Sequence, residues 1–349
     1  MNRSLRDRTP DASALAVPDF ANFVRSSLTT DPWKMSTMAR MSLAARPMYR
    51  WQLRTRTLEL GSRTHLMAIV NITPDSFSGD GLCKVTVEEA IASAVRAHDN
   101  GADVLDLGAE STRPGAIPIT ATEEQGRLLP VLEGLMRERP QAVVSVDTYH
   151  ASTARAAIRL GVEIVNDVSG LEWDSDMART VAESGCGLVL MHARGRPAQW
   201  KLQTRLPASK VLPTVFSGLC ERLTLAEASG VSSERILIDP GFGFGKIDNE
   251  NVVLLAGLPR LHELGRPLLV GLSRKSFLAN LVQSVQGTSL PIPEARRVAT
   301  ITGNVAAILA GAHVLRVHEL QAAREAAAVA DALLEAEEPS MRKVVGFDA

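Results

Sequence analysis

The sequence predicts an α/β fold in which eight parallel strands and their helices close into a (β/α)₈ TIM barrel, formed by a single domain. Two observations favour this fold. Short apolar runs alternate with Ala- and Leu-rich helical windows along most of the chain, which is typical of a parallel sheet crossed by helices. The runs are almost continuously apolar, as strands covered on both faces must be. With eight such runs, a closed barrel is favoured over an open dinucleotide-binding sheet.

The expected strands and helices alternate in chain order. The strands are residues 66–71, 104–107, 143–147, 164–167, 188–191, 236–239, 268–271 and 314–317. The clearest helical windows between them are residues 87–99, 123–137, 152–160 and 296–310. Residues 194–206, which follow the fifth strand and are rich in Arg, Gln and Trp, fit neither pattern.

The composition limits the partners that the protein can have. A formal charge of −1 at pH 7 argues against nucleic acid or an anionic membrane as the main partner, since both bind a net basic face. No apolar run reaches the length of about 18 residues that a membrane helix needs. The cysteines Cys83, Cys186 and Cys220 are scattered and odd in number, which favours a reducing compartment. We therefore expect a cytoplasmic protein.

The first 47 residues differ from the rest of the chain. They mix Arg, Ser, Asp and Pro without sustained periodicity, and they lack the pattern of a signal peptide. We expect residues 1–47 to be a disordered extension, or to result from a start codon assigned too early. The barrel is expected over residues 48–340, and a tail over residues 341–349.

Nearly every expected strand ends in a side chain that can hydrogen-bond or carry charge. The C-terminal ends of barrel strands converge on one mouth, which is where the active sites of this fold lie. Each residue by itself has a simpler explanation as a turn residue or helix cap, but together they predict a site. In chain order they are Asn71, Asp147, Asn166, Asp167, His192, Asp239, Ser273, Arg274, Lys275, Arg316 and His318.

Asp147, Asn166 and Asp239 offer two carboxylates and an amide at this mouth. A flat heterocycle with an amino group and a ring N–H needs such partners, because a carboxylate can accept both protons in a bidentate pair. Apolar walls for such a ring are expected at Met191, Phe244 and Gly271.

Cations follow the last two strands, which is the usual phosphate corner of this fold. Lys275 and Arg316 carry the charge, and His318 points to the same side of an extended chain as Arg316. Thr112 and Asn71 can add neutral donors. This cluster fits an anion such as diphosphate. The alternative is that Arg316 pairs with a carboxylate inside the barrel.

The glycine-rich segment GFGFGK at residues 241–246 does not have the G-x-G-x-x-G spacing of a dinucleotide-binding loop, and no acidic partner about 20 residues later is evident. We interpret it as a flexible loop that allows close backbone approach.

These residues lie in segments that closely resemble the dihydropteroate synthase family, in the family's order and from residue 66 to the C-terminus. NITPDSFS, ESTRPGA, DPGFGFGK and SRKSF are long enough to be specific. MHARG, RVHEL and SGDG stand where the family commonly has MHMQG, RVHDV and SDGG, and they remove no matched residue. The segments are MAIVNITPDSFSGDG (67–81), DVLDLGAESTRPGA (103–116), SVDTYH (145–150), EIVNDVSG (163–170), LVLMH (188–192), ILIDPGFGFGK (236–246), LLVGLSRKSFL (268–278) and HVLRVHEL (313–320).

The resemblance implies roles for individual residues. Asn71 would contribute to a Mg²⁺ and diphosphate site, and Arg316 would lie over the face of a pterin ring. The ring itself would be held by Asp147, Asn166, Asp239 and Lys275. The diphosphate would be bound by Arg316, His318 and Thr112. Two loops would close over the site and bring Phe77, Arg113 and Pro114 beside p-aminobenzoate, whose carboxylate would contact Ser276.

The resemblance implies a transferase of folate biosynthesis that joins a dihydropterin diphosphate to p-aminobenzoate, with Mg²⁺ as cofactor and an SN1-like displacement of diphosphate. One alternative is a pterin-binding methyltransferase barrel, which would have no use for STRPGA, SRKSF or the Arg316 and His318 pair. Another is a catalytically inactive pterin-binding module.

The expected helix over residues 296–310 is apolar and rich in small residues around much of its circumference. We expect one stripe to face the strands and a second to face outward. The resemblance implies a homodimer built on the late barrel helices, which would cover the outer stripe by two-fold symmetry. The alternative is that neighbouring helices cover it. The inner stripe is expected at Val298, Ile301, Val305 and Ile308, and the outer one at Ala299, Thr302, Ala306 and Leu309.

Overall fold

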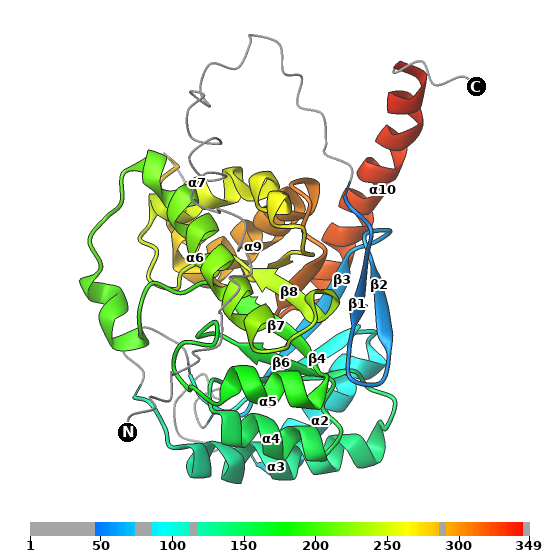
Figure 1. The fold of residues 1–349 in the computed structure, drawn as a ribbon. Coiled ribbons are helices and arrows are strands. Elements are labelled where there is room, and N and C mark those ends of the chain that lie inside the picture. Colours follow the sequence, from blue (N-terminus) through cyan, green and yellow to red (C-terminus); the bar gives the residue numbers. More distant parts are fainter. Residues whose placement is uncertain (1–45, 74–85, 112–116, 286–290, 345–349) are drawn as a thin grey trace, which may run out of the picture. The chain divides into compact units, whose positions relative to one another are not determined.

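A computed structural model of the protein describes residues 46–73, 86–111, 117–285 and 291–344. Its centre is a parallel sheet of eight strands: β3 (His65–Asn71), β4 (Val104–Gly108), β5 (Val144–Asp147), β6 (Ile164–Asp167), β7 (Gly187–Met191), β8 (Ile236–Asp239), β9 (Leu269–Val270) and β10 (Val314–Val317). Their order in the sheet is β8-β7-β6-β5-β4-β3-β10-β9. A parallel bridge between Ile238 of β8 and Leu268, which directly precedes β9, joins the two ends of the sheet, so the sheet closes on itself. Figure 1 shows the strands at the centre of the fold with helices around them. The predicted α/β barrel is confirmed.

Helices follow the strands and cover the outside of the barrel. They are α2 (Val87–Asp99), α3 (Ala121–Glu138), α4 (Ala151–Arg159), α5 (Met177–Ser184), α6 (Ala208–Ala228), α7 (Asn249–Ala256), α8 (Ser276–Gln283), α9 (Ile292–Leu309) and α10 (Leu320–Val344). The four expected helical windows correspond to α2, α3, α4 and α9. Among the described residues, no helix is both long enough and apolar enough to cross a bilayer.

Local sequence explains where these elements begin. At the start of α2, the Thr86 hydroxyl accepts the Glu89 amide at 3.2 Å, and the Glu89 carboxylate accepts the Thr86 amide at 2.9 Å. Such a capping box satisfies two backbone donors that the first helical turn leaves free. The irregular stretch after β7 contains a short 3₁₀ helix, η1 (Pro197–Leu202), whose first residue is a proline.

A hairpin covers one end of the barrel. Its antiparallel strands β1 (Tyr49–Gln52) and β2 (Thr57–Leu60) precede β3 and were not predicted as strands. Trp51 is 1% exposed, and its indole N–H donates to the Arg235 carbonyl at 2.8 Å. With Leu53 and Leu60 it packs on side chains from the first three residues of barrel strands, namely Met67, Val104, Ile164, Val189, Leu237, Leu269 and Val314. The opposite end, formed by the carboxyl ends of the strands, is therefore the one that can hold a site.

Two residues before the hairpin also contact the barrel. The Arg46 side chain is 3% exposed and forms an ion pair of 2.8 Å with Asp331 of α10. The same guanidinium donates to the Thr64 hydroxyl and the Ala312 carbonyl. The Pro47 carbonyl lies 2.9 Å from Nε2 of buried His313. The domain start at residue 48 stays a prediction, and these contacts lie just before it.

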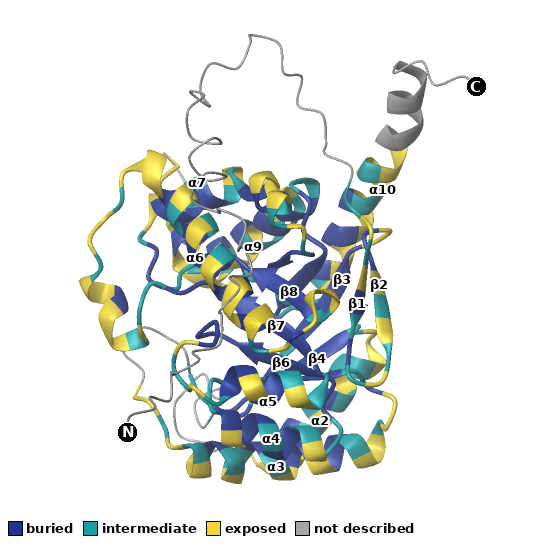
Figure 2. Cartoon of the chain, viewed as in Figure 1, coloured by how far each residue is buried: buried dark blue, intermediate teal, exposed yellow. Residues whose placement is uncertain are grey.

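Helix α9 differs in part from the predicted arrangement of its faces. Ile308 is buried and Ala306 is exposed, as expected, but Val298 is 38% exposed and Ala299 is buried. Figure 2 shows the same mixture of buried and exposed residues on the helices around the buried strands. The reason is close packing, because a Cβ at Gly303 would lie 3.0 Å from a methyl of Leu278. Small side chains therefore face inward, and the prediction for Val298 and Ala299, which assumed that the larger residue is buried, is wrong. The residues buried on α9 are Ala295, Ala299, Gly303, Asn304, Ala307 and Ile308.

Candidate active site

The register of the sheet places the predicted polar residues beside one another at the carboxyl ends of the strands. Asn71 pairs with Gly108, and Gly108 pairs with Asp147. Asp147 in turn pairs with Asn166 of β6. A Cβ at Gly108 would lie 3.3 Å from the Cβ of Asp147, so the glycine leaves room for this carboxylate. Asn71, Asp147 and Asn166 therefore share one edge of the mouth.

Arg316 of β10 reaches past β3 to two carboxylates. Its Nε donates to Asp106 Oδ2 at 2.6 Å, and its Nη2 donates to Asp147 Oδ2 at 2.6 Å. Pairing within the barrel, the alternative considered for Arg316, is thus present in the structure. The planar fork of a guanidinium suits such a double contact.

Asp106 is a site residue that the sequence analysis missed. It is completely buried, and it also accepts the Ser145 hydroxyl at 2.7 Å and the Asn166 amide nitrogen at 3.0 Å. Its carboxylate therefore holds both Asn166 and Arg316 in place. A signal for it exists in the sequence, because a lone Asp inside the apolar strand VLDLG is a buried charge that needs a partner.

Burial and charge act in opposite directions on this group. Burial raises the pKa of Asp147, and the neighbouring carboxylate of Asp106 raises it further, while Arg316 opposes the shift. Burial lowers the pKa of Arg316, but Asp106 and Asp147 outweigh it and leave that pKa raised. A buried ion pair of this kind is costly to break, because the remaining charge has no water to solvate it.

Asp239 and Lys275 are two further charged groups of the mouth, and each acts electrostatically on the other. Asp239 is 6% exposed, and its Oδ1 accepts the Gly241 amide at 2.7 Å. Burial raises the pKa of Asp239, and this backbone hydrogen bond and the charge of Lys275 oppose the rise. Burial lowers the pKa of Lys275 to about 8. The Lys275 ammonium lies 4.3 Å from the ring centroid of Phe244, which is a cation–π geometry.

The turn that presents Lys275 is held by its neighbours. The Ser273 hydroxyl lies 2.9 Å from His318 Nδ1 and accepts the His318 amide at 3.3 Å. Arg274 has a φ of +60°, in the left-handed region, and its amide donates to the Thr300 hydroxyl at 3.1 Å. Ser276 follows as the exposed first residue of α8. The structure therefore brings Lys275 and His318 to the same corner, as predicted.

Two of the predicted wall residues belong to one apolar cluster. Met191 is 2% exposed and packs with Val168 and Ala193. Phe244 packs against this cluster, and its ring lies edge-on to Trp200 at 5.1 Å between centroids. Gly271 lies beside Arg316, whose Cβ would be 3.8 Å from a Cβ at Gly271. Four predicted residues, Phe77, Thr112, Arg113 and Pro114, lie outside the described residues.

An acidic group next to the mouth was also missed. Glu124 of α3 is 1% exposed and accepts the Thr148 hydroxyl at 2.8 Å, and His150 Nδ1 lies 3.1 Å away from the same carboxylate. The Tyr149 hydroxyl donates to Glu110 at 2.9 Å. These bonds brace the segment that follows Asp147. The carboxylates of Glu110 and Glu124 and the His150 ring lie within 4.8 Å of one another.

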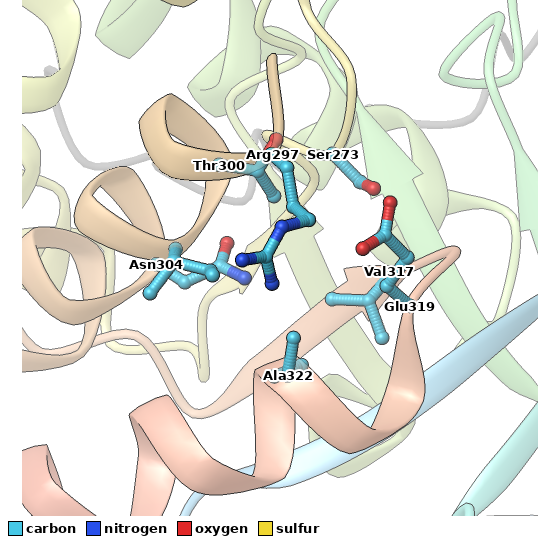
Figure 3. A pocket seen from close by; sticks show the side chains of 9 residues that line it. Ser273, Arg297, Thr300, Asn304, Val317, Glu319 and Ala322 are labelled. Carbon is cyan, nitrogen blue, oxygen red and sulfur yellow. The ribbon is translucent and has the colours of Figure 1, made fainter. Parts of the chain in front are cut away.

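A small cavity lies behind Ser273. It has a volume of about 10 Å³ and is lined in part by Ser273, Arg297, Asn304 and Glu319, with the Arg297 side chain between α9 and the start of α10 (Figure 3). Such a volume holds about one water molecule. It is therefore too small for a ring-shaped substrate and is not part of the candidate active site.

The fold and the site together define a barrel enzyme whose mouth is lined by buried carboxylates, an amide and cations. The family model of pterin binding enzymes matches residues 67–318. The chain is 36% identical over 277 residues to dihydropteroate synthase of Escherichia coli (strain K12), covering 79% of this chain and 94% of that protein.

The solved structures include a neighbour from Xanthomonas albilineans. It is a dihydropteroate synthase with 4-aminobenzoic acid, 38% identical with a TM-score of 0.72, and the match covers 82% of this chain and 98% of that one. The chain is also 38% identical over 287 residues to the mitochondrial folate synthesis bifunctional protein of Arabidopsis thaliana, covering 79% of this chain. It spans about half the length of this and two further plant relatives, from 50% to 58%. The chain belongs to the dihydropteroate synthase family of pterin binding enzymes.

Proposed function

We propose that the chain condenses (7,8-dihydropterin-6-yl)methyl diphosphate with p-aminobenzoate to 7,8-dihydropteroate and diphosphate. The observation that carries the proposal is the buried constellation of Asp147, Asn166 and Asp239 with Lys275 and Arg316 at the barrel mouth. The Xanthomonas albilineans relative has been solved with 4-aminobenzoic acid and with 7,8-dihydropteroate. Each of these groups has a role in the proposed condensation.

The pterin binds between Met191 and the Arg316 guanidinium, with its polar edge toward the carboxylates. The Asp239 carboxylate accepts from the ring amino group and a ring N–H, which is the bidentate pairing that a carboxylate offers. Lys275 donates a hydrogen bond to the ring from the side opposite Asp239. Asp106 acts from behind, because it fixes the direction of Asn166 and Arg316.

The diphosphate binds at the corner formed by Arg316, His318 and Lys275. Asn71 offers one hard oxygen ligand at the end of β3, and Mg²⁺ in proteins completes such a set with waters and substrate phosphates. Magnesium held there would neutralise charge on the departing diphosphate. The group of Glu110, Glu124 and His150 fits Mg²⁺ less well, because one ligand is an imidazole and Glu124 already accepts hydrogen bonds.

The reaction breaks the bond between the pterin methylene carbon and the diphosphate oxygen. Positive charge that develops on the methylene is shared with the electron-rich pterin and stabilised by the carboxylates of Asp147 and Asp239, which are already in position. The neutral amine of p-aminobenzoate then forms the new C–N bond and releases a proton. Ser276, at the N-terminus of α8, contacts the benzoate carboxylate, since helix N-termini bind anions. The family resemblance assigns Thr112 to the diphosphate and Phe77, Arg113 and Pro114 to p-aminobenzoate.

A turnover assay tests the proposal. The purified chain is incubated with the pterin diphosphate, p-aminobenzoate and Mg²⁺, and diphosphate and dihydropteroate are measured in the same sample. We expect equimolar formation of both, dependent on both substrates. Pterin binding without release of diphosphate would support the inactive binding module instead.

We also propose a homodimer built on the late helices and a cytoplasmic location. The dimer rests on large apolar side chains that are exposed on α8, α9 and α10 and on the segments that flank α8 and α9, three helices that pack side by side. Exposed apolar patches mark interaction sites, and protein–protein interfaces are among them. The location rests on the scattered cysteines. The exposed side chains are Leu281, Val285, Ile292, Val298, Val329 and Leu333.

A further inference from the structure

Lys246, the last residue of the glycine-rich segment, is buried next to the active site and has no part in the chemistry described so far. It is 6% exposed. Its ammonium donates to the carbonyl oxygens of His192 at 2.9 Å, Gly241 at 2.7 Å and Phe244 at 3.3 Å. A lysine ammonium has three N–H donors, so each of them has an acceptor.

The path of the backbone makes this arrangement possible. Gly241, Gly243 and Gly245 have φ values of +68°, +80° and +72°, in a region of backbone conformation that residues other than glycine rarely adopt. The segment therefore curls around the Lys246 ammonium and turns its carbonyls inward. A Cβ at Gly241 would lie 2.1 Å from the His192 carbonyl oxygen, so this turn also needs a glycine for space. The predicted close backbone approach is present, and the Lys246 ammonium holds the loop through two of its carbonyls, those of Gly241 and Phe244.

The three carbonyls link Lys246 to the groups proposed to bind the pterin. His192, which supplies the first carbonyl, directly follows Met191 in the chain. Its amide donates to the Asp239 carbonyl at 2.9 Å. Gly241 is the residue whose amide donates to the Asp239 carboxylate. The third carbonyl belongs to Phe244, whose ring lies under the Lys275 ammonium. One side chain thus fixes the backbone of the β7 end and of the loop after β8.

The charge of Lys246 also acts on Asp239. Burial lowers the pKa of Lys246 well below its ordinary value, and the Asp239 carboxylate opposes this shift. In the other direction, Lys246 and Lys275 counteract the rise that burial causes in the pKa of Asp239. The three converging carbonyls favour the ammonium form of Lys246, because a neutral amine has two N–H donors and would turn its lone pair toward the third carbonyl.

We propose that Lys246 is a positioning residue for pterin binding, which holds Phe244 and the Asp239 carboxylate in place through the carbonyls of the glycine-rich loop. This inference rests on the proposed function, since it concerns the same pterin site. It predicts that removing the ammonium weakens the pterin selectively, while p-aminobenzoate, which is expected to lie at α8 and the two loops, is little affected.

The test compares Lys246→Met with Lys210→Met, in which an exposed lysine of α6 is changed in the same way. Calorimetry with 6-hydroxymethylpterin gives the dissociation constant, and steady-state kinetics give KM for each substrate. We expect Lys246→Met to weaken pterin binding by about tenfold or more, as when a buried charged donor is lost. The KM for p-aminobenzoate should stay within about twofold of wild type. As the pH falls, pterin binding to Lys246→Met should weaken at a higher pH than pterin binding to wild type. The reason is that the pKa of Asp239 rises when the charge of Lys246 is lost.

Unchanged pterin affinity and an unchanged pH dependence in folded Lys246→Met would overturn the inference, even if its melting temperature fell. If that variant does not fold, Lys246→Arg decides the matter, because it keeps the charge but its planar donors do not fit three converging carbonyls. Pterin affinity equal to wild type in Lys246→Arg would then overturn the inference, and weaker affinity would support it. A wild-type chain that neither binds the pterin nor turns over would instead refute the proposed function.

Discussion

Arg316 of β10 and Asp106 of β4 form an ion pair of 2.6 Å across the mouth of the barrel. The Asp106 side chain is fully buried and the Arg316 side chain is 20% exposed, so the buried carboxylate holds the more exposed guanidinium in place. Together with the contact to Asp147, this pair fixes the guanidinium, whose side chain stays 20% exposed. This relationship explains how an arginine can serve both the barrel and a substrate.

Replacing Asp106 with Asn should therefore disturb the site and the fold together. The amide would present a donor to Arg316 Nε, and the guanidinium would lose one of the two carboxylates that it pairs with, keeping only Asp147. We expect the free energy of unfolding to fall by about 3–5 kcal/mol, the usual cost of breaking a buried ion pair. Urea denaturation measures this change. Asp176→Asn, which breaks a surface pair with Arg179, is the control and should cost under about 1 kcal/mol. Similar losses for the two variants would contradict the anchoring role of Asp106.

The lowered pKa of Lys275 predicts a pH dependence. Burial brings this pKa to about 8 in the free enzyme, so the ammonium loses its proton as the pH rises through that value. We expect kcat/KM for the pterin diphosphate to fall above about pH 8, since this parameter reports groups of the free enzyme. Lys275→Arg should move this limb to higher pH, because a guanidinium stays protonated. An identical alkaline limb in wild type and variant would assign it to another group.

Arg46 should contribute to stability although it lies within the segment expected to be an extension. Its guanidinium binds Asp331, the Thr64 hydroxyl and the Ala312 carbonyl, and it is nearly buried. We expect Arg46→Ala to lower the free energy of unfolding by about 3 kcal/mol or more, because Asp331 and backbone groups lose their partner. The matched variant is Arg50→Ala, whose side chain is 75% exposed and pairs with Glu59. Equal melting temperatures for both variants would show that the contacts of Arg46 are dispensable.

The proposed dimer makes a prediction at Ala306, an exposed residue of α9. Glu at this position would place like charges near each other across a two-fold axis. We expect light scattering to give a dimer mass for wild type at micromolar concentration and a lower mass for Ala306→Glu. Ala92→Glu on the exposed face of α2 should remain dimeric. A monomer mass for wild type would refute the dimer.

Much of the fold and part of the site could be predicted from the sequence. Strands of a parallel barrel are buried on both faces, so their apolar runs and the polar residues that end them stand out. For this reason the amino-acid pattern alone predicts Asp147, Asn166, Asp239 and Arg316 at the mouth. Their side-chain partners, however, depend on register across the sheet, which a run of apolar residues does not encode.

The residues that were missed illustrate this limit. Asp106 stands inside a strand rather than at its end, and its function as an acceptor for Ser145 and Arg316 exists only when β4, β5 and β10 come together. Glu124 has the sequence surroundings of a surface helix. On α9, the close contact at Gly303 selects the inner face, so side-chain size alone predicted the wrong side for Val298.

The proposed binding of the pterin ring by Asp239 is tested most directly by titrating Asp239→Asn with a pterin. The amide presents a donor toward the ring N–H groups where the carboxylate accepted them, and losing a charged partner in a buried site costs about 1.5–3 kcal/mol. Isothermal titration calorimetry with 6-hydroxymethylpterin should therefore show binding weaker by at least about tenfold in a variant whose circular dichroism matches wild type. Wild-type pterin affinity in the folded Asp239→Asn protein would contradict the account.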